Sequence, residues 1–252
     1  MISIVVVYNN GQILNDILVK NLKNQTAEYE LIAVDNTKGT FISAAHALNF
    51  GGNKAIGKYI MFIHQDVALD SSIWLETVEN KLNDLQSLGI AGVVGMSTRG
   101  RNYNERWRGY IDNNGEIWPW CKPLQMSEEV QTLDECLLII PSLTFRKMQF
   151  DEKTFDGWHC YGADYCLSVI YIGLKAYVLP VFIRHMSPSS NVQNLFKYQM
   201  RLFLKHKKNY PIVFTTCGEI SWIKLPFLFI KSKLIEINVF RPIYNILKKY
   251  RV

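Results

Sequence analysis

The sequence predicts an α/β protein whose mixed, mostly parallel sheet is flanked by helices and followed by a helical C-terminal extension. Short runs of β-branched residues recur through the first part of the chain. The intervals between them carry apolar residues at helical spacing, for example Ile13, Ile17 and Leu18. Continuous apolar strands that alternate with helices are typical of sheets that are covered on both faces. The expected strands are residues 2–8, 29–35, 58–64 and 89–96.

Composition limits the classes of protein to which this chain can belong. The chain has 252 residues, of which 48% are hydrophobic, and this excludes a disordered protein. Its longest apolar stretches, "LLII" and "LPFLFI", are far shorter than the roughly 20 residues that a membrane span needs. Five cysteines form no C-x-x-C pair, so we expect reduced structural thiols and no zinc site. Met1 leads directly into the first strand without a cleavable leader, which predicts a cytoplasmic protein.

Polar side chains stand at the carboxyl ends of the first three strands. Residues 8–11, "YNNG", end the first strand, residues 35–37, "DNT", the second, and residues 64–66, "HQD", the third. Ligands of open α/β sheets bind beyond the carboxyl ends of the strands, so these clusters predict the rim of a site. The segment "YNNGQIL" lacks the G-x-G-x-x-G pattern of dinucleotide-binding folds, which argues against an NAD-dependent hydride transferase.

The order of these features resembles the GT-A glycosyltransferases, in particular the family-2-like inverting enzymes. The resemblance covers residues 2 to about 187 and rests on Asp35, on "NFGGNKAIGKYI" before the third strand, and on the triplet after that strand. It implies a Rossmann-like nucleotide-diphospho-sugar transferase fold and a nucleotide-sugar donor, for which uridine is the expected nucleoside. The residues expected to bind the nucleotide are Tyr8, Asn9, Asp35, Asn36, Asn53, His64 and Gln65.

The same resemblance implies a divalent cation, Mn²⁺ or Mg²⁺, at the end of the third strand. The family's triplet there is usually Asp-x-Asp, whereas this chain has His64, Gln65 and Asp66 and so retains only the last carboxylate. One or two carboxylates suffice for such a cation when phosphate oxygens and water complete its shell. Asp66 is therefore expected to bind the metal, together with His185 at the end of a further expected strand, "AYVLPVFIRH". The alternatives are a capping or turn role for Asp66 and ordinary strand-end positions for the two histidines.

The second block of the resemblance implies a catalytic base. "YGADYCL" retains the aspartate of the family's helix-opening Glu-Asp pair as Asp164, with Ala163 in place of the glutamate, so Asp164 is the expected base. The alternative is a carboxylate that only stabilises the start of a helix. If Asp164 is dispensable, the base would be Asp134 or Glu135, which lead a buried strand in "TLDECLLIIP". The residues that either line the sugar pocket or pack in the core are Trp158, His159 and Tyr161.

A segment rich in Arg, Trp and Tyr, residues 98–125, lies between these two blocks. Its turn at residues 113–115, "NNG", predicts the tip of a hairpin between "RWRGYID" and "EIWPW". Aromatic faces stack on sugars and arginines pair with phosphates, which would suit a donor or acceptor loop. An ordinary hairpin packed on the sheet explains the pattern equally well.

Charge divides the chain into two parts. From residue 190 onward there are twelve Lys or Arg against two Glu, a net charge of +10, while residues 1–189 carry −4. We expect a catalytic domain over 1–189, with a nucleotide-binding half of about 1–97 and an acceptor half of about 98–189. The basic helical extension, 190–252, would lie on an anionic membrane surface. The alternatives are helices packed on the catalytic domain and a dimer contact.

Together these features predict an inverting, metal-dependent glycosyltransferase of the hexosyltransferase type. It would move a sugar from a UDP-sugar to a glycan or lipid-linked acceptor in polysaccharide biosynthesis, in the cytoplasm and peripheral to the inner face of the membrane. The missing first aspartate of the triplet and Ala163 leave a non-catalytic nucleotide-sugar or glycan-binding module as the alternative. Nucleic acid is not an expected partner, because the basic tail lacks a recognised RNA- or DNA-binding motif.

Overall fold

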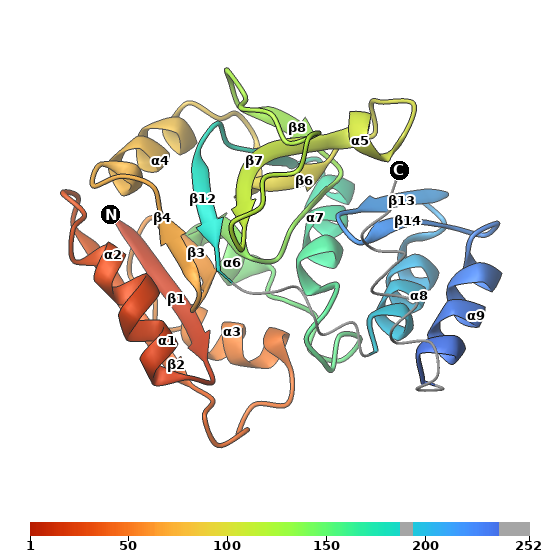
Figure 1. Cartoon of the computed structure of the whole chain (residues 1–252), viewed down its shortest axis with the longest axis horizontal. Coiled ribbons are helices and arrows are strands. Elements are labelled where there is room, and N and C mark those ends of the chain that lie inside the picture. Colours follow the sequence, from red (N-terminus) through yellow and green to blue (C-terminus); the bar gives the residue numbers. More distant parts are fainter. Residues whose placement is uncertain (187–193, 237–252) are drawn as a thin grey trace.

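The computed structural model describes residues 1–186 and 194–236 and centres on a seven-stranded sheet (Figure 1). In spatial order its strands are β2 (Tyr29–Asp35), β1 (Ile2–Tyr8), β3 (Tyr59–His64), β10 (Leu137–Pro141), β5 (Leu88–Gly92), β11 (Lys175–Val178) and β8 (Glu128–Val130). β1 is parallel to β2 and β3, and β11 is parallel to β5. β10 runs antiparallel between β3 and β5, and β8 is antiparallel to β11. The sheet is therefore mixed, and antiparallel pairs are as frequent in it as parallel ones.

A second, five-stranded sheet shares a hydrophobic core with the first. In spatial order its strands are β4 (Val67–Leu69), β12 (Phe182–His185), β7 (Trp107–Asn113), β6 (Val94–Met96) and β9 (Thr132–Leu133). The chain passes between the sheets at two points where the sequence predicted unbroken strands, Val93 and Leu179–Val181. Pro180 explains the second break, because proline cannot donate a hydrogen bond to a continuing ladder. The second break leads into β12, which ends at His185.

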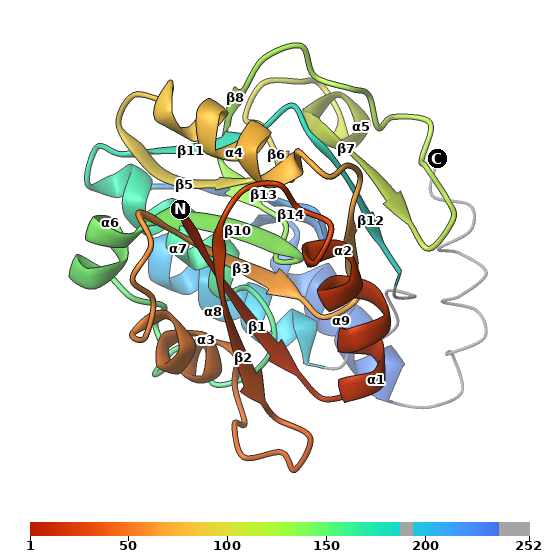
Figure 2. The ribbon, with the colours of Figure 1, turned by 90° about the vertical axis from the view of Figure 1, so that its left-hand side faces the viewer.

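Helices cover both faces of the main sheet (Figure 2). One face carries α4 (Trp74–Asn83) and a continuous helix made of α1 (Gly11–Ile13), the π-helical η1 (Leu14–Val19) and α2 (Lys20–Leu22). The other face carries α3 (Ala44–Gly52), α6 (Ser142–Lys147), α7 (Tyr161–Tyr171) and α8 (Leu195–His206). Ile4 and Val5 of β1 are both fully buried, one on each face, because successive side chains of a strand point to opposite sides. The predicted α/β class is confirmed.

The arginine- and tryptophan-rich segment forms one strand and a tight turn. It opens with α5 (Tyr103–Arg106) and continues as β7. Asn114 and Gly115 both have positive φ, 58° and 84°, as a two-residue hairpin turn requires, so the predicted tip is confirmed. The expected return strand over "EIWPW" is reduced, within the described ranges, to isolated bridges such as that between Asn113 and Glu116. Three indole rings of this segment pack against one another, those of Trp107, Trp118 and Trp120. They therefore do not form an open platform.

The part of the basic extension that the structure describes is packed on the core formed by residues 1–186. Its elements are α8, the hairpin of β13 (Ile212–Thr215) and β14 (Gly218–Ser221), and α9 (Leu225–Glu236). Leu202 and Phe203 of α8 are fully buried in the main core. Residues 187–193 and 237–252 of the predicted extension lie outside the described residues. No helix in the described ranges combines the length and the apolarity needed to cross a bilayer.

All five cysteines have free thiols, as predicted. Four of them are buried, and burial raises the pKa of the Cys121 thiol to about 11, so this group is unreactive at neutral pH. Cys217 differs, since it lies exposed between β13 and β14.

Candidate functional site

The triplet His64-Gln65-Asp66 connects the two sheets. His64 is the last residue of β3, Gln65 and Asp66 form a turn, and β4 begins at Val67 in the second sheet. Because β3 is parallel to β1, His64 pairs with Val7 and the triplet lies beside the carboxyl end of β1. The three polar residues therefore stand at the sheet edge where the sequence predicted a site.

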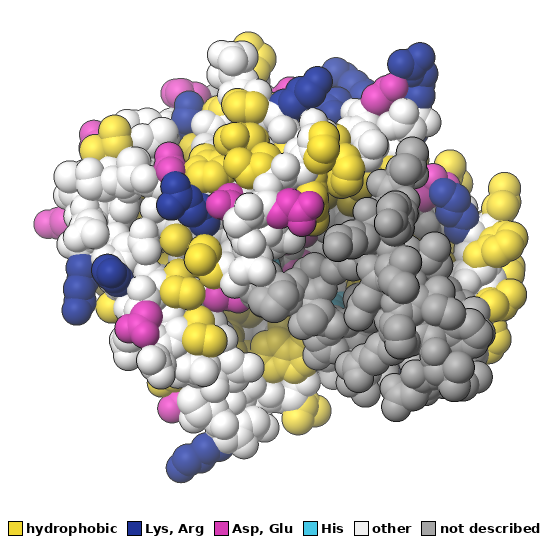
Figure 3. Space-filling view, in the orientation of Figure 1, with side chains coloured by type: hydrophobic (Ala, Val, Ile, Leu, Met, Phe, Trp, Pro, Cys, Tyr) yellow, Lys and Arg dark blue, Asp and Glu magenta, His cyan; other side chains and the backbone are white. Residues whose placement is uncertain are grey.

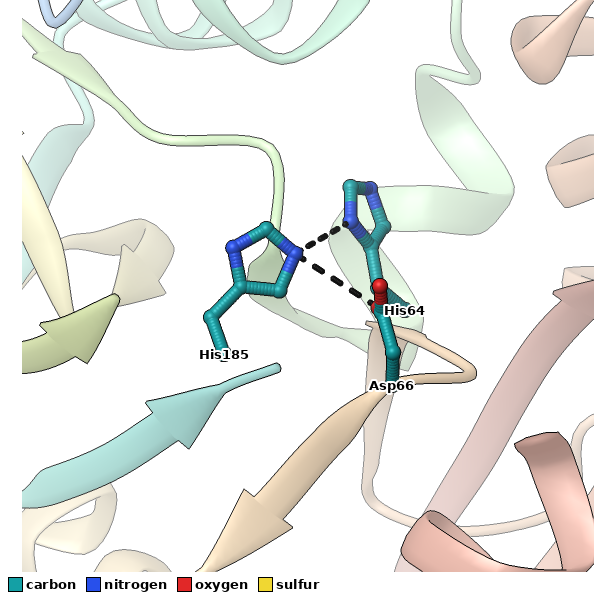
Figure 4. Close-up of side chains that lie close together, drawn as sticks. All are labelled: His64, Asp66 and His185. Carbon is teal, nitrogen blue, oxygen red and sulfur yellow. Dashed lines mark hydrogen bonds and ion pairs between the residues drawn. The ribbon is translucent and has the colours of Figure 1, made fainter. Parts of the chain in front are cut away.

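His64, Asp66 and His185 point toward one another (Figure 4). Nε2 of His185 lies 3.4 Å from Nδ1 of His64 and 3.5 Å from Oδ1 of Asp66. One ligand atom of each residue lies within 4.8 Å of the other two. Met186 donates its N–H to the carbonyl oxygen of Asp66 at 2.9 Å, so a backbone bond holds the end of β12 against the turn. In the part of the chain that the structure describes, no other three His, Cys, Asp or Glu residues gather in this way.

Partial burial and mutual charge set the protonation of this cluster. The side chains of His185 and Asp66 are 15% and 17% exposed. Burial and the neighbouring His185 lower the pKa of His64, so its imidazole is neutral at pH 7. Burial alone would lower the pKa of His185, but the hydrogen bond and charge of Asp66 outweigh it and raise that pKa. Burial likewise opposes ionisation of Asp66, and the two histidines outweigh it and lower the pKa of its carboxyl.

This donor set fits a divalent transition metal. One carboxylate oxygen and two imidazole nitrogens suit Mn²⁺ better than Mg²⁺, which prefers oxygen ligands and water. A cation binds the neutral form of His185, so it would take the place of a proton there as the positive partner of Asp66. His64 was predicted to bind the nucleotide, whereas the geometry groups it with Asp66 and His185. The available signal was its position, because His64 stands where the family's first metal-site aspartate would be.

Tyr8 and Asp35 lie side by side at the ends of β1 and β2, on the same edge as the cluster. The exposed carboxylate of Asp35 accepts hydrogen bonds from the N–H of Thr37 at 2.8 Å and from its hydroxyl at 2.7 Å. These bonds are the largest cause of the lowered pKa of the Asp35 carboxyl. Burial and the charge of Asp35 raise the pKa of the Tyr8 phenol. An ionised, exposed carboxylate beside a phenol can hydrogen-bond the hydroxyls of a ribose.

Three of the other residues predicted to bind the nucleotide use their side-chain amides in hydrogen bonds to other residues of the protein. The Gln65 side chain accepts from the N–H groups of Asn9 and Asn10, both at 3.1 Å, and donates to Oδ1 of Asn9 at 2.7 Å. This amide pair joins the turn after β3 to the loop after β1. Asn36 is buried and exchanges hydrogen bonds of 2.8 and 3.0 Å with the backbone of Phe41. These residues shape the rim of the site.

Asn53 is not brought to this site. It follows α3 directly and precedes β3, so it lies near the amino ends of the strands and not near their carboxyl ends. Its side chain accepts a hydrogen bond from Gln149, and nearby Gly57 donates its N–H to the Ser3 hydroxyl at 2.8 Å, at the start of β1. A nucleotide at the carboxyl ends of β1 and β2 is out of its reach. The prediction for Asn53 is therefore corrected to a role at the end of α3.

Asp164 lies in the first turn of α7, as the sequence predicted, but its carboxylate is enclosed. The side chain is 4% exposed, and Oδ1 lies 2.7 Å from Nε2 of His206 and 2.8 Å from Nζ of Lys205. Lys205 also contacts Asp151 at 2.8 Å. This network joins α7 to α8. No local signal marks it in the sequence, since His206 lies 42 residues beyond Asp164.

Glu135 lies between the end of β3 and the start of α7. The N–H of His64 donates to the carbonyl oxygen of Cys136 at 3.0 Å, which places Glu135 beside the triplet. Oε1 of half-buried Glu135 accepts from the N–H of Gly162, in the first turn of α7, at 2.8 Å. Burial raises the pKa of the Glu135 carboxyl to about 8. A carboxylate of that basicity can take up a proton near neutral pH.

The three residues expected to line a sugar pocket differ in exposure. Tyr161 is buried, and its ring packs edge-on against Phe150 with centroids 5.5 Å apart, so it belongs to the core. His159 is half-buried, with its ring 6.3 Å from that of Tyr198. Trp158 is 45% exposed and is the one of the three whose ring could stack on a sugar from outside.

Comparison with known sequences gives a family model and a relative. A family model described as "Glycosyltransferase like family" matches residues 3–209. A protein of Fuscovulum blasticum named "ATP synthase subunits region ORF 6" is 25% identical over 205 residues, which cover 72% of this chain and 73% of that protein.

Several solved structures have a similar fold. The mannosyltransferase PcManGT of Pyrobaculum calidifontis, in complex with GDP-Man and Mn²⁺, has a TM-score of 0.52 at 15% identity, covering 92% of this chain and 69% of that one. GalNAc-T7 with UDP, GalNAc and Mn²⁺ has a TM-score of 0.57 at 12% identity, covering 81% and 47%. S. aureus TarS with UDP-GlcNAc has a TM-score of 0.54 at 14% identity, covering 82% and 66%. At these identities the likeness shows the fold alone.

Proposed function

The chain belongs to the glycosyltransferase-like family and has the GT-A fold, and on that premise we propose that it is an inverting, metal-dependent hexosyltransferase. Its donor is a UDP-sugar, and its acceptor is a glycan or a lipid-linked sugar in polysaccharide biosynthesis. The observation that carries the proposal is the cluster of His64, Asp66 and His185 on the sheet edge that also holds Tyr8 and Asp35. The complexes of PcManGT with GDP-Man and of TarS with UDP-GlcNAc support a nucleotide-sugar donor.

His64, Asp66 and His185 would hold the cation. When bound, a divalent cation supplies positive charge for a diphosphate leaving group. Mn²⁺ is the expected ion because of the two imidazoles, and Mg²⁺ is the weaker candidate. Asp35 and Tyr8 would orient the ribose, and the amide pair of Gln65 and Asn9 would keep their loop beside the cluster. Each of these assignments rests on the placement of the side chains at one sheet edge.

We assign the general base to Glu135 rather than to Asp164. The acceptor hydroxyl must lose its proton as it attacks the sugar carbon from the face opposite the nucleotide. The Asp164 carboxylate is enclosed by side chains of α8, whereas Glu135 lies beside the end of β3 and has a pKa of about 8 through burial. The third candidate, Asp134, already accepts hydrogen bonds on both carboxylate oxygens, at 3.0 and 2.7 Å.

A nucleotide-sugar-binding module without catalysis is the second candidate. The enclosed carboxylate of Asp164 favours it, because the position that the resemblance gives to the base is occupied by a structural ion pair. A module would bind the donor and the cation but would not turn the donor over. The cytoplasmic location expected from the sequence is retained here as part of the proposal.

The test is a thermal-shift panel of UDP-, GDP-, dTDP- and CMP-sugars, each with and without Mn²⁺. A ligand that binds only the folded state raises the melting temperature, and a concentration 100 times the Kd contributes about 2.7 kcal/mol. We expect a UDP-selective shift that requires Mn²⁺, followed by release of UDP when a glycan acceptor is added. Absence of a metal-dependent shift with any nucleotide sugar would contradict both candidates, and a shift without turnover would leave the binding module.

A further inference from the structure

An exposed apolar face lies over α9 and the hairpin that precedes it. Figure 3 shows hydrophobic side chains along the right-hand edge of the molecule, where Figure 1 places α9 and the ends of β13 and β14. Its members are between 41% and 80% exposed: Ile212, Trp222, Ile223, Phe227 and Ile230. We call this set the α9 face.

Part of the α9 face lies on one side of the helix. Phe227 and Ile230 are three residues apart in α9, which is the spacing of one helix face, and Ile223 lies in the turn directly before the helix. Leu225 and Leu228, which alternate with them, turn inward and pack against the main core. The inner side of α9 is therefore already used by the domain, and its outer side is apolar as well.

The β13–β14 hairpin and α8 fix the position of Trp222 in this face. The ring of Trp222 meets Phe203 of α8 edge-on, with centroids 5.2 Å apart. Ile212, Trp222 and Ile223 line one apolar hollow of about 300 Å³. Because Phe203 is fully buried, the exposed tryptophan is anchored to the core and its position is set by the fold.

Cations border the α9 face. Nζ of Lys207 lies 4.8 Å from the ring centroid of Trp222, and Lys208 beside it is exposed. Lys224, within the face, pairs with Glu219 at 2.9 Å. Glu219 is one of only two acidic residues from position 190 onward, against twelve Lys or Arg. The face thus combines exposed apolar side chains with a positive surrounding.

We propose that the α9 face docks on an anionic phospholipid surface. Trp222, Ile223 and Phe227 would enter the boundary between headgroups and acyl chains, and Lys207 and Lys208 would contact phosphate. Charge complementarity selects this partner, because a second copy of the chain would bring two positively charged faces together. A tryptophan at the boundary, exposed aliphatic residues and bordering lysines are typical of helices that lie in a membrane interface.

The proposal is independent of sugar transfer, since it rests on residues outside the site. It would place an enzyme that acts on lipid-linked sugars at the surface that carries them. Vesicle binding can therefore be measured without nucleotide, metal or acceptor, and its failure would leave the proposed function untouched.

The experiment is co-sedimentation of the full-length protein with vesicles of phosphatidylcholine, or of an equal mixture of phosphatidylcholine and phosphatidylglycerol. We expect partitioning onto the anionic vesicles to be at least about tenfold stronger, and to weaken as salt is raised. The double substitution Ile223→Ser with Phe227→Ser should lower this binding at least about tenfold. The matched control is Leu143→Ser with Ile172→Ser, two residues outside the face with exposed fractions of 72% and 57%, and it should bind as the wild type does.

A second substitution separates charge from apolar contact. Lys207→Gln with Lys208→Gln should weaken binding to the anionic vesicles and flatten its salt dependence, and it keeps the apolar residues. Circular dichroism and melting temperature show whether each variant is folded. If Ile223→Ser with Phe227→Ser does not fold, Lys207→Gln with Lys208→Gln decides the question. Three results would overturn the proposal. The first is no binding of the wild type to anionic vesicles, and the second is wild-type binding by folded variants with substitutions in the α9 face. The third is a wild-type dimer that Ile223→Ser with Phe227→Ser converts to a monomer.

Discussion

Asp164→Asn separates a structural from a catalytic role for the carboxylate in the first turn of α7. The side chain is 4% exposed and contacts Nε2 of His206 at 2.7 Å and Nζ of Lys205 at 2.8 Å. Hydrogen bonds to charged groups contribute about 1.5–3 kcal/mol each, and asparagine keeps the shape of the side chain without its charge. Because asparagine can still accept one bond, we expect the free energy of unfolding to fall by about 2–4 kcal/mol. For a chain of this size the melting temperature should fall by about 5–15 °C.

The matched control for this substitution is Asp156→Asn. Asp156 also contacts α8, through Arg201 at 2.6 Å and the hydroxyl of Tyr198 at 2.8 Å, but its side chain is 44% exposed and asparagine can still accept the bond from that hydroxyl. An exposed ion pair contributes about 0–1 kcal/mol, so this variant should melt close to the wild type. Thermal and urea unfolding give the stabilities, and kcat is measured at a temperature where all three proteins are folded. We expect the kcat of Asp164→Asn to stay within about tenfold of the wild type, since a structural carboxylate does not touch the reacting atoms.

The opposite pattern would refute this reasoning. If folded Asp164→Asn melts as the wild type does and its kcat is about 10²–10⁴ lower, the enclosed carboxylate is the base. The α7–α8 network would then have to open during turnover, and the role of base would return to the residue that the family resemblance implies.

Two further substitutions test the site. Asp66→Asn should leave the fold intact and weaken Mn²⁺-dependent UDP binding by about 100-fold or more. Replacing a residue that only orients a metal ligand already lowers metal affinity about 10–100-fold, and Asp66 is itself a proposed ligand. Calorimetry that finds unchanged Mn²⁺-dependent binding would show that the ligand set is wrong. Glu135→Gln should lower kcat by about 10²–10⁴ with little change in donor affinity. The same substitution should change the pH dependence of stability. Burial raises the pKa of the Glu135 carboxyl to about 8 in the folded protein, whereas the pKa of a glutamate in an unfolded chain is about 4. The wild type therefore loses stability as the pH rises from about 4 to about 8. The glutamine variant lacks this loss, so its advantage should be larger at pH 9 than at pH 5, and parallel melting curves for the two proteins across that range would contradict the assignment.

The sequence predicts the strands better than it predicts what the side chains at their ends do. β1 has the expected bounds, because a strand buried on both faces requires an unbroken apolar run, and the edge strand β2 also has the expected bounds although Val34 is its one buried residue. The passage from β5 to β6 at Val93 has no such signal, since it depends on the second sheet that packs there. Asp164 and Asn53 were assigned by their order along the chain. Order along the chain does not show that α8 encloses the Asp164 carboxylate. It also does not show that Asn53 lies near the amino ends of the strands, away from the candidate site.

The proposed metal cluster would draw its ligands from two parts of the chain that the fold brings together. His64 and Asp66 flank the turn from β3 to β4, while His185 ends β12, 121 residues beyond His64. A cation that binds only the assembled cluster stabilises the docking of β12 against β4 by mass action. Such a site needs fewer carboxylates than an exposed one, because the backbone bond from Met186 to Asp66 and the pairing of β12 with β4 already fix two of the three ligands. A chain that retains a single aspartate of the usual pair can therefore still provide a cation site, with histidines from both sheets completing it.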